Sequence, residues 1–205
     1  MKPLYSFRHV TLCVVALAGT LAVSSGCASG PDAKGTVDSM SAFGNEVAKV
    51  KDSIDNAVRA LEGVVNSPAG DLKANFEAYT KSVKALEEQS KVVQRHADDM
   101  KAKGDEFFKE WETSKTVTPE RRSELAAAYA KIKEDIVLAR EKFTPYLASL
   151  KDIDSYLSLD LSIKGLNSVS ELVKKAKDNG AQVKSRIDSV LVQLNSVRGM
   201  LSTAK

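Results

Sequence analysis

The chain has 205 residues, with 30 basic and 27 acidic side chains and a formal net charge of +3. Because positive and negative charges are nearly balanced and interspersed, the sequence lacks the basic surface that nucleic-acid binding requires, so no nucleic-acid partner is expected. The few aromatic residues, and the near absence of proline from long segments rich in Ala, Lys, Glu, Ser and Val, are typical of an all-helical protein.

The N-terminus resembles a secretory signal. Uncharged residues run from Val10 to Val23 between the basic Lys2 and Arg8 and a group of small residues, which is the pattern of a signal peptide over residues 1–26. The apolar stretch is too short to span a bilayer. Cleavage after Gly26 would lower the net charge from +3 to +1 and leave a single cysteine, so no disulfide within the mature chain is expected.

The segment Ser24-Ser25-Gly26-Cys27 resembles the lipobox of bacterial lipoproteins, with Ser24 at a position where Leu is usual. This resemblance implies that Cys27 becomes the first residue and carries diacylglycerol and an amine-linked acyl chain such as palmitate, which would anchor the protein to a membrane. In such lipoproteins Asp after the cysteine favours the inner membrane, and here that residue is Ala28, so the outer membrane is expected. The alternative is ordinary cleavage near Ala28 or Ser29, which would leave a soluble periplasmic protein.

After a short tether over residues 27–35, we expect a helical domain over residues 36–205. In four segments, apolar or small residues recur at alternating spacings of three and four, which is the seam pattern of a left-handed coiled coil. The seams comprise Met40, Phe43, Val47, Val50, Ile54, Ala57, Leu61 and Val64; Leu72, Phe76, Tyr79, Val83, Leu86, Ser90, Val93, Ala97, Met100, Gly104, Phe107 and Trp111; Leu125, Tyr129, Ile132, Ile136, Ala139, Phe143, Tyr146, Leu150, Ile153 and Leu157; and Leu166, Val169, Val173, Ala176, Gly180, Val183, Ile187, Val190, Leu194, Val197 and Leu201.

The punctuation between these segments predicts helices over roughly residues 36–65, 71–115, 119–160 and 168–203. Asp71 can cap the second helix, and Thr118 before Pro119 suits the start of the third. Ser168 followed by Glu171 fits a capping box for the fourth. Pro145 lies inside the third helix, where we expect a kink and not a break.

Short loops make neighbouring helices antiparallel, so the fold is predicted to be an elongated all-α antiparallel bundle of four long helices. The register of the second and third helices pairs Val93 with Phe143 and Ala97 with Ala139, in a core expected to be close-packed. Small residues at seam positions, namely Ser90, Gly104 and Gly180, mark weak layers. Heptad seams can be satisfied within one chain or between chains, which leaves a homo-oligomer open.

The sequence contains no recognisable catalytic or metal-binding pattern. After signal removal the only histidine is His96, which flanks a seam position, and no Glu-x-x-His pair, Cys-x-x-Cys-His or Gly-x-Ser-x-Gly motif is present. We therefore predict a protein that is not an enzyme and that has no cofactor and no metal.

The end of the hairpin between the second and third helices is aromatic and basic. Phe108, Trp111, Arg121 and Arg122 are residue types favoured at binding hot spots, so this end is a candidate partner-docking site. The alternative is that Phe107, Trp111 and Tyr129 simply close one end of the core. Phe108 is the only one of these aromatics outside the seam.

Three stretches in the central part of the chain are distinctive: Gly104-Asp105-Glu106-Phe107-Phe108-Lys109-Glu110-Trp111-Glu112, Arg121-Arg122, and Phe143-Thr144-Pro145-Tyr146-Leu147-Ala148-Ser149-Leu150-Lys151-Asp152. On these residues the chain resembles a family of bacterial secreted helical proteins known as domain of unknown function 2959. The likeness covers residues 36–203 and implies an extended helical fold in the cell envelope. The family has no assigned activity, so it transfers no functional residue.

These observations predict a periplasm-facing, non-catalytic lipoprotein of the cell envelope. Its bundle is expected to act as a protein-binding or scaffolding element with an envelope protein as partner, and Cys27 is expected to be the lipidation site. The alternative is a lipid- or amphiphile-binding bundle that exposes part of its apolar seam to a ligand.

Overall fold

The computed structural model describes residues 33–67, 71–113 and 117–202. The predicted signal peptide, Cys27 and most of the tether lie outside these residues. The described part contains four α-helices: α1 (Ala33–Val65), α2 (Leu72–Thr113), α3 (Pro119–Leu159) and α4 (Ile163–Ser202). The prediction of an all-α bundle of four long helices is confirmed.

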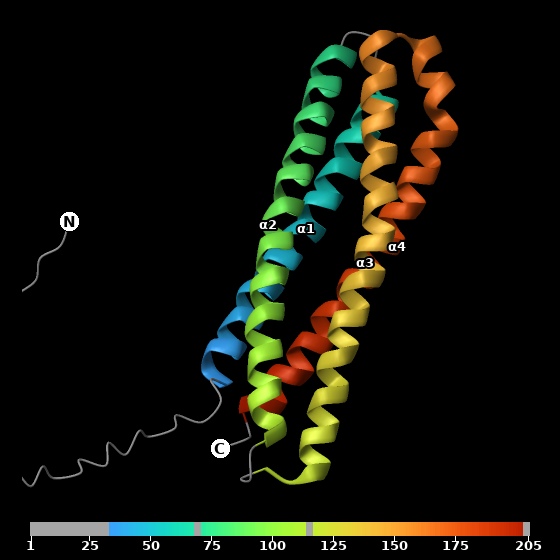
Figure 1. Cartoon of the computed structure of the whole chain (residues 1–205). Helices are drawn as coiled ribbons and strands as arrows, with labels where there is room; N and C mark the ends of the chain where they lie inside the picture. Colours follow the sequence, from blue (N-terminus) through green and yellow to red (C-terminus); the bar gives the residue numbers. More distant parts are fainter. Residues whose placement is uncertain (1–32, 68–70, 114–116, 203–205) are drawn as a thin grey trace, which may run out of the picture. The chain divides into compact units, whose positions relative to one another are not determined.

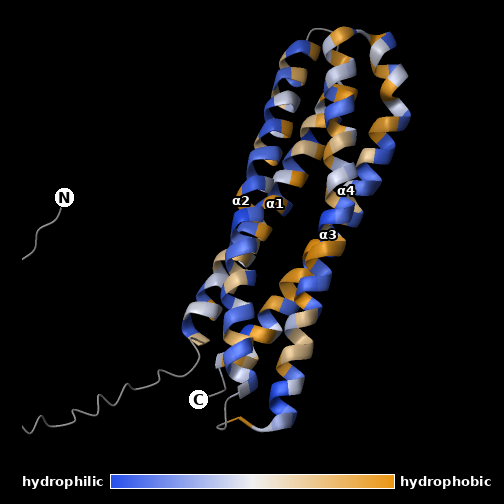
Figure 2. Ribbon diagram, viewed as in Figure 1, coloured by the Kyte–Doolittle hydropathy of each residue, from blue (hydrophilic) through white to orange (hydrophobic). Residues whose placement is uncertain are grey.

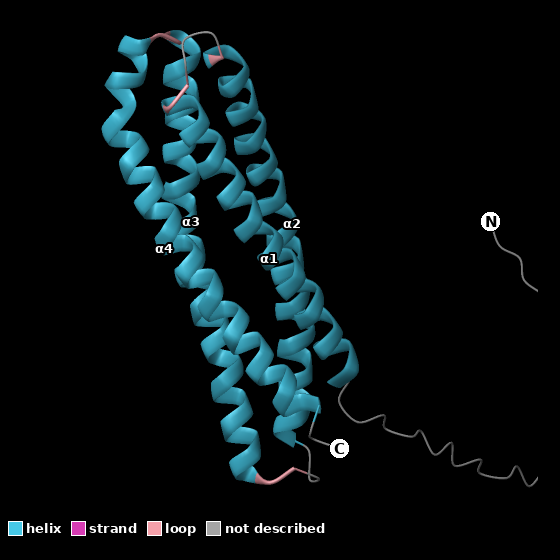
Figure 3. Cartoon of the chain, turned by 180° about the vertical axis from the view of Figure 1, so that it is seen from behind, coloured by secondary structure: helices cyan, strands magenta, loops and turns pink. Residues whose placement is uncertain are grey.

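The helices run alternately up and down, and short connections join consecutive ones (Figures 1 and 3). α1 packs against α2 and α4, and α3 packs against the same two helices, so the order around the bundle follows the chain. α1 and α3 lie diagonally opposite, as do α2 and α4. The interface between α2 and α3 is the sparsest of the four.

The seams of α1 and α4 are buried along their whole length. Every seam position predicted for these two helices is buried, including Val47, Val50, Ile187 and Val190 near the middle of the bundle. Each helix shows hydrophilic and hydrophobic residues alternating along its length (Figure 2), as expected for amphipathic helices whose apolar stripes meet in a core.

The seams of α2 and α3 are buried only toward the ends of the bundle. Residues such as Leu86, Met100, Ile132 and Leu150 are inaccessible to solvent. Between them, six seam residues are only half-buried: Ser90, Val93, Ala97, Ile136, Ala139 and Phe143. The expectation of a close-packed core along the full α2–α3 interface is therefore wrong for its middle section.

The structure confirms the predicted start of α3 and corrects the predicted starts of α1 and α4. Thr118 caps α3 as predicted, because its Oγ1 accepts the Arg121 N–H at 3.3 Å and Pro119 occupies the first turn. The predicted start at Ser168 is wrong: α4 begins at Ile163, where the Ser162 Oγ accepts the Gly165 N–H at 3.1 Å. Residues 33–35, which we assigned to the tether, form the first turn of α1.

Two of the three predicted weak layers are filled by tyrosine rings. A Cβ on Gly104 would lie 2.3 Å from the Tyr129 hydroxyl oxygen, and one on Gly180 would lie 3.2 Å from the Tyr146 ring. Each glycine therefore provides the space for a ring from a neighbouring helix. The third position, Ser90, has no such filling and opens onto a cleft. α3 continues through Pro145 without a break.

Candidate binding cleft

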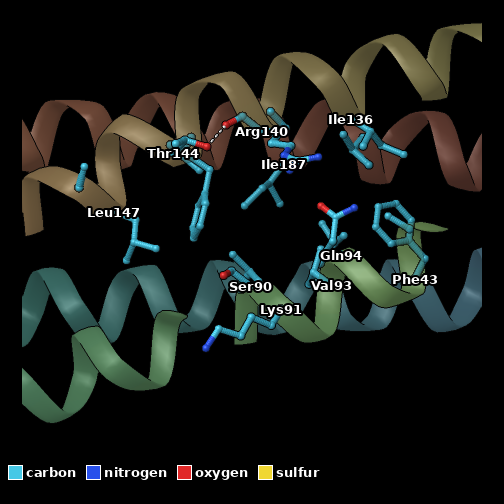
Figure 4. A pocket seen from close by; sticks show the side chains of 18 of the residues that line it. Phe43, Ser90, Lys91, Val93, Gln94, Ile136, Arg140, Thr144, Leu147 and Ile187 are labelled. Carbon is cyan, nitrogen blue, oxygen red and sulfur yellow. Dashed lines mark hydrogen bonds between the residues drawn. The ribbon is translucent and has the colours of Figure 1, made fainter. Parts of the chain in front are cut away.

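The half-buried seam residues of α2 and α3 border a cleft of about 540 Å³ in the middle of the bundle (Figure 4). The cleft forms because the side chains here are small. Ser90 and Ala97 on α2 and Ala139 on α3 occupy seam positions where larger residues would meet across the α2–α3 interface. Small side chains on facing positions leave space that a well-packed core would fill.

All four helices contribute to the lining of the cleft. Phe43, Val47 and Val50 come from α1, and Val183, Ile187 and Val190 come from α4. Because these α1 and α4 residues are buried, they form the floor of the cleft, while α2 and α3 form its walls. The walls comprise Ser90, Lys91, Val93, Gln94, Ala97, Ile136, Ala139, Arg140, Phe143, Thr144, Leu147, Ala148 and Lys151.

Toward the α1–α2 connection, polar contacts tie α2 and α3 together beyond the cleft. The buried Tyr79 hydroxyl donates to the Leu150 carbonyl oxygen at 2.7 Å, and Thr80 bonds the Asp154 carboxylate. The Lys151 Nζ lies 3.1 Å from the Glu87 carboxylate and closes this end of the cleft.

Toward the α2–α3 connection, a second set of contacts closes the interface. The Tyr129 hydroxyl donates to the Lys101 carbonyl oxygen at 3.1 Å and lies 3.2 Å from Oδ1 of Asp105. The Lys133 Nζ lies 3.0 Å from the same carboxylate. Contacts therefore close the α2–α3 interface toward both of its ends, and the cleft opens between them.

Burial raises the pKa values of the tyrosines around the core. Tyr79, Tyr129 and Tyr146 all have raised pKa values, chiefly because burial disfavours the phenolate, and nearby Asp154, Asp105 and Asp55, respectively, add to the effect. These phenols therefore stay protonated at neutral pH. The Tyr146 hydroxyl is buried, and it has no hydrogen-bond partner among the residues that the structure describes.

Among the described residues that line the cleft, every ionisable side chain is a cation: Lys91, Arg140 or Lys151. The Lys91 Nζ lies 2.7 Å from the Glu88 carboxylate, whose hydrogen bond raises the pKa of Lys91. Ser90, Gln94 and Thr144 supply the remaining polar side chains of the lining.

The predicted docking residues gather at the α2–α3 end of the bundle, away from the cleft. The Phe108 ring stacks on Tyr129 at 4.4 Å between centroids and on Trp111 at 6.3 Å. Phe107 meets Trp111 edge to face at 4.8 Å. Phe107, Trp111 and Tyr129 are buried and close this end of the core, whereas Phe108 is half-buried.

Both arginines of that end bond backbone carbonyls of neighbouring helices. Arg121 donates to the Met200 carbonyl oxygen at 3.0 Å and also pairs with Glu124, while Arg122 donates to the Glu112 carbonyl oxygen at 2.8 Å. These bonds fasten the start of α3 to the ends of α4 and α2, so both side chains take part in holding the bundle together.

Within the described ranges, no group of three or more His, Cys, Asp or Glu side chains is arranged to hold a metal ion. In the same residues, no helix combines the length and the apolar character needed to cross a membrane. His96 flanks the seam on α2 as predicted, but it is half-buried and not a fully exposed surface residue.

Comparison with protein families identifies the chain's relatives. Residues 35–198 match the family described as protein of unknown function (DUF2959). The chain belongs to this family. Neither the curated proteins nor the solved structures include a match.

The heptad pattern of this DUF2959 member does not predict the cleft, although small seam residues point to it. The pattern predicts a weak layer at Ser90, whereas it predicts that Ala97 and Ala139 pair in a close-packed core. Three small residues at seam positions of two adjacent helices are the available signal. Their effect depends on the distance between α2 and α3, which a heptad pattern does not give.

Proposed function

We propose that this DUF2959 protein is a non-catalytic binding protein that holds the apolar part of an amphiphile in the cleft between α2 and α3. The observation that supports this function is an apolar cleft of about 540 Å³ lined by all four helices. Sites for small molecules and cofactors are concave, mostly apolar and about 300–1,000 Å³ in volume.

The chemistry of the floor favours an apolar occupant over water. Val47, Val50 and Ile187 offer no hydrogen-bonding side-chain atoms, and an ordered water needs two to four polar partners. An alkyl chain in the cleft would be stabilised by about 0.8 kcal/mol for each methylene removed from water. The polar residues at the mouth would leave the other end of the ligand in contact with solvent.

An uncharged apolar dye tests this function. We expect N-phenylnaphthylamine to bind the full-length protein with a rise in fluorescence. Ala139→Phe places a phenyl ring in the cleft and is expected to weaken dye binding by at least about tenfold, because the volume for the ligand is filled. Ala127→Phe is the matched control, since Ala127 is exposed on the same helix and does not line the cleft.

The two variants separate the possible results. Loss of dye binding in Ala139→Phe but not in Ala127→Phe would support binding in the cleft. Equal binding by both variants would place the dye elsewhere, and no saturable binding by the unmodified protein would refute the proposal. Circular dichroism of each variant checks that the helices are retained.

A lipid anchor at Cys27 is the second part of the proposal. It rests on the signal-like N-terminus and the lipobox resemblance, and it would hold the bundle in the periplasm at the outer membrane. We expect labelled palmitate to be incorporated in cells and Cys27→Ala to release the protein from the membrane fraction. A soluble unmodified protein without label would instead favour ordinary signal cleavage.

A protein-binding or scaffolding role is the alternative function, and half-buried Phe108 is the feature that favours it. The test is photocrosslinking in intact cells from positions 108 and 122. One reproducible protein adduct would support docking of an envelope partner at this end. Adducts only to lipid or to a second copy of the chain would argue against it.

A further inference from the structure

The charged residues that line the cleft are all of one sign. In the described part of the chain, its lining contains three cations and no acidic residue. Two of them are neutralised locally, because Lys91 pairs with Glu88 and Lys151 pairs with Glu87. Within the residues that the structure describes, the side chain of the third cation, Arg140, makes no ion pair or hydrogen bond.

The surroundings of Arg140 on its own helix explain why it has no partner. On a helix, side chains interact with those three and four positions away. For Arg140 these positions hold Ile136, Val137, Phe143 and Thr144, none of which is charged. The guanidinium is therefore an exposed cation that stands beside an apolar cleft with no internal counter-charge.

Two polar but uncharged residues of the cleft lining, one on the same helix and one on α2, accompany Arg140. Thr144, one turn along α3, donates its hydroxyl to the Arg140 carbonyl oxygen at 3.1 Å, and Gln94 borders the cleft from α2 (Figure 4). The mouth here thus combines hydrogen-bonding groups with one uncompensated positive charge, directly above the apolar floor.

Building on the proposed binding function, we infer that the ligand is a fatty acid whose carboxylate is held at Arg140 and whose chain lies along the floor. A guanidinium offers parallel N–H donors that match the two oxygens of a carboxylate. From Arg140 the α3 wall continues to Lys151, a distance of about 16 Å at 1.5 Å per residue, so the chain can extend away from the charged end.

A fatty acid is compatible with the closed end of the cleft as well as with the end that carries Arg140. The ion pair between Lys151 and Glu87 spans α2 and α3 where the cleft ends, so an alkyl chain meets a neutralised boundary there. Arg140 would repel a cationic head group, and a neutral head group would leave the Arg140 guanidinium without a counter-charge. The arrangement therefore selects for negative charge at one end of the ligand.

Displacement of bound N-phenylnaphthylamine from the full-length protein tests the inference. Three single-chain competitors of equal chain length are compared below their micellar concentrations: laurate, dodecyl maltoside and dodecyltrimethylammonium. We expect laurate to displace the dye at the lowest concentration. Arg140→Gln is expected to weaken laurate about fivefold, the effect of one exposed ion pair, and to leave dodecyl maltoside unchanged.

Two further variants make the result specific to Arg140. Lys142→Gln removes an exposed positive charge from the same helix outside the cleft lining and should leave all three competitors unchanged. Arg140→Lys keeps the charge and should retain most of the preference for laurate. Since Arg140 is exposed, these substitutions are expected to preserve the fold, which thermal unfolding checks.

The outcomes distinguish this inference from the function on which it rests. If all three competitors displace the dye equally, or if Arg140→Gln weakens them all equally, the carboxylate selectivity is overturned while binding in the cleft stands. If phosphatidylglycerol vesicles compete better than laurate in an Arg140-dependent way, the fatty-acid assignment is overturned. If the dye itself does not bind, the proposed function fails.

Discussion

The interface between α1 and α4 and the interface between α2 and α3 carry the same heptad period but different structures. The α1–α4 interface is buried throughout and is bridged by ion pairs between Lys51 and Asp188, Lys184 and Asp55, and Lys177 and Glu62. The α2–α3 interface is fastened toward its two ends and open between them. A common period thus sets which residues face inward, whereas side-chain size decides whether the space they face is filled.

The largest expected effect compares two leucines on α3 at the closed and open parts of the α2–α3 interface. Leu150→Ala should lower the free energy of unfolding by about 3 kcal/mol, because Leu150 is inaccessible to solvent and its loss leaves a cavity. Leu147→Ala, in the cleft lining, should cost about 1 kcal/mol, because Leu147 is only half-buried. Urea denaturation measures both. Equal costs would mean that the cleft is closed in solution.

Two helical glycines extend the comparison to added volume. Gly104→Ala should lower the free energy of unfolding by about 2 kcal/mol, because the new methyl group would overlap the Tyr129 ring. A methyl group on Gly199 would lie within 4 Å of no described side chain, so Gly199→Ala should raise the free energy of unfolding by about 0.5 kcal/mol through the gain in helix propensity. Urea denaturation measures the change in the free energy of unfolding for both variants. If Gly104→Ala instead stabilised the protein, the Tyr129 ring would have to move freely away from the added methyl group.

High pH should weaken the end fastened by Tyr79. The phenol has a raised pKa in the fold, so above pH 10, its ordinary value, the unfolded chain loses the proton while the folded chain keeps it. The free energy of unfolding should then fall by up to about 1.4 kcal/mol per pH unit for this tyrosine and show no such fall below pH 10. Denaturation of Tyr79→Phe across pH 9–12 should give a shallower slope. An unchanged slope would contradict the assignment.

The smallest effect concerns the ion pair at one end of the cleft. Glu87→Gln removes the partner of Lys151 and should lower the free energy of unfolding by about 0.5 kcal/mol, because both side chains are partly exposed. A double-mutant cycle with Lys151→Gln isolates the pair energy, which should decrease further in high salt. A coupling several times larger would show that this pair, and not the packing beyond it, holds the end closed.

The seam residues could be predicted because a period of three and four specifies which side of a helix faces the core. The same pattern did not reveal the cleft, since Val93 and Phe143 face inward whether or not they touch. The start of α4 was misplaced for a different reason. Ser162 and Ser168 both precede helix-compatible residues, and the Ser168–Glu171 spacing imitates a capping box inside a helix that had already begun.

The selectivity inferred for the cleft also lay beyond sequence analysis. The spacing of the helices decides that Arg140 lines the cleft and that Lys151 on α3 meets Glu87 on α2. The pairing of Lys91 with Glu88 differs, because these residues lie three positions apart on α2 and the charge pattern of that helix already brings them together. The aromatic cluster at the α2–α3 end was easier to find, because Phe107, Phe108 and Trp111 are close together on a single helix.

The pairing of α1 with α4 has a consequence for how the chain folds. These are the first and last helices, and the contact between Lys51 and Asp188 joins residues 137 positions apart. The α1–α2 and α3–α4 hairpins can form from local contacts, but the floor shared by α1 and α4 is completed only when the last helix arrives. Until then, a chain made from its N-terminus leaves exposed the part of the α1 apolar stripe that α4 covers in the complete bundle, and that interval is when it is most exposed to aggregation.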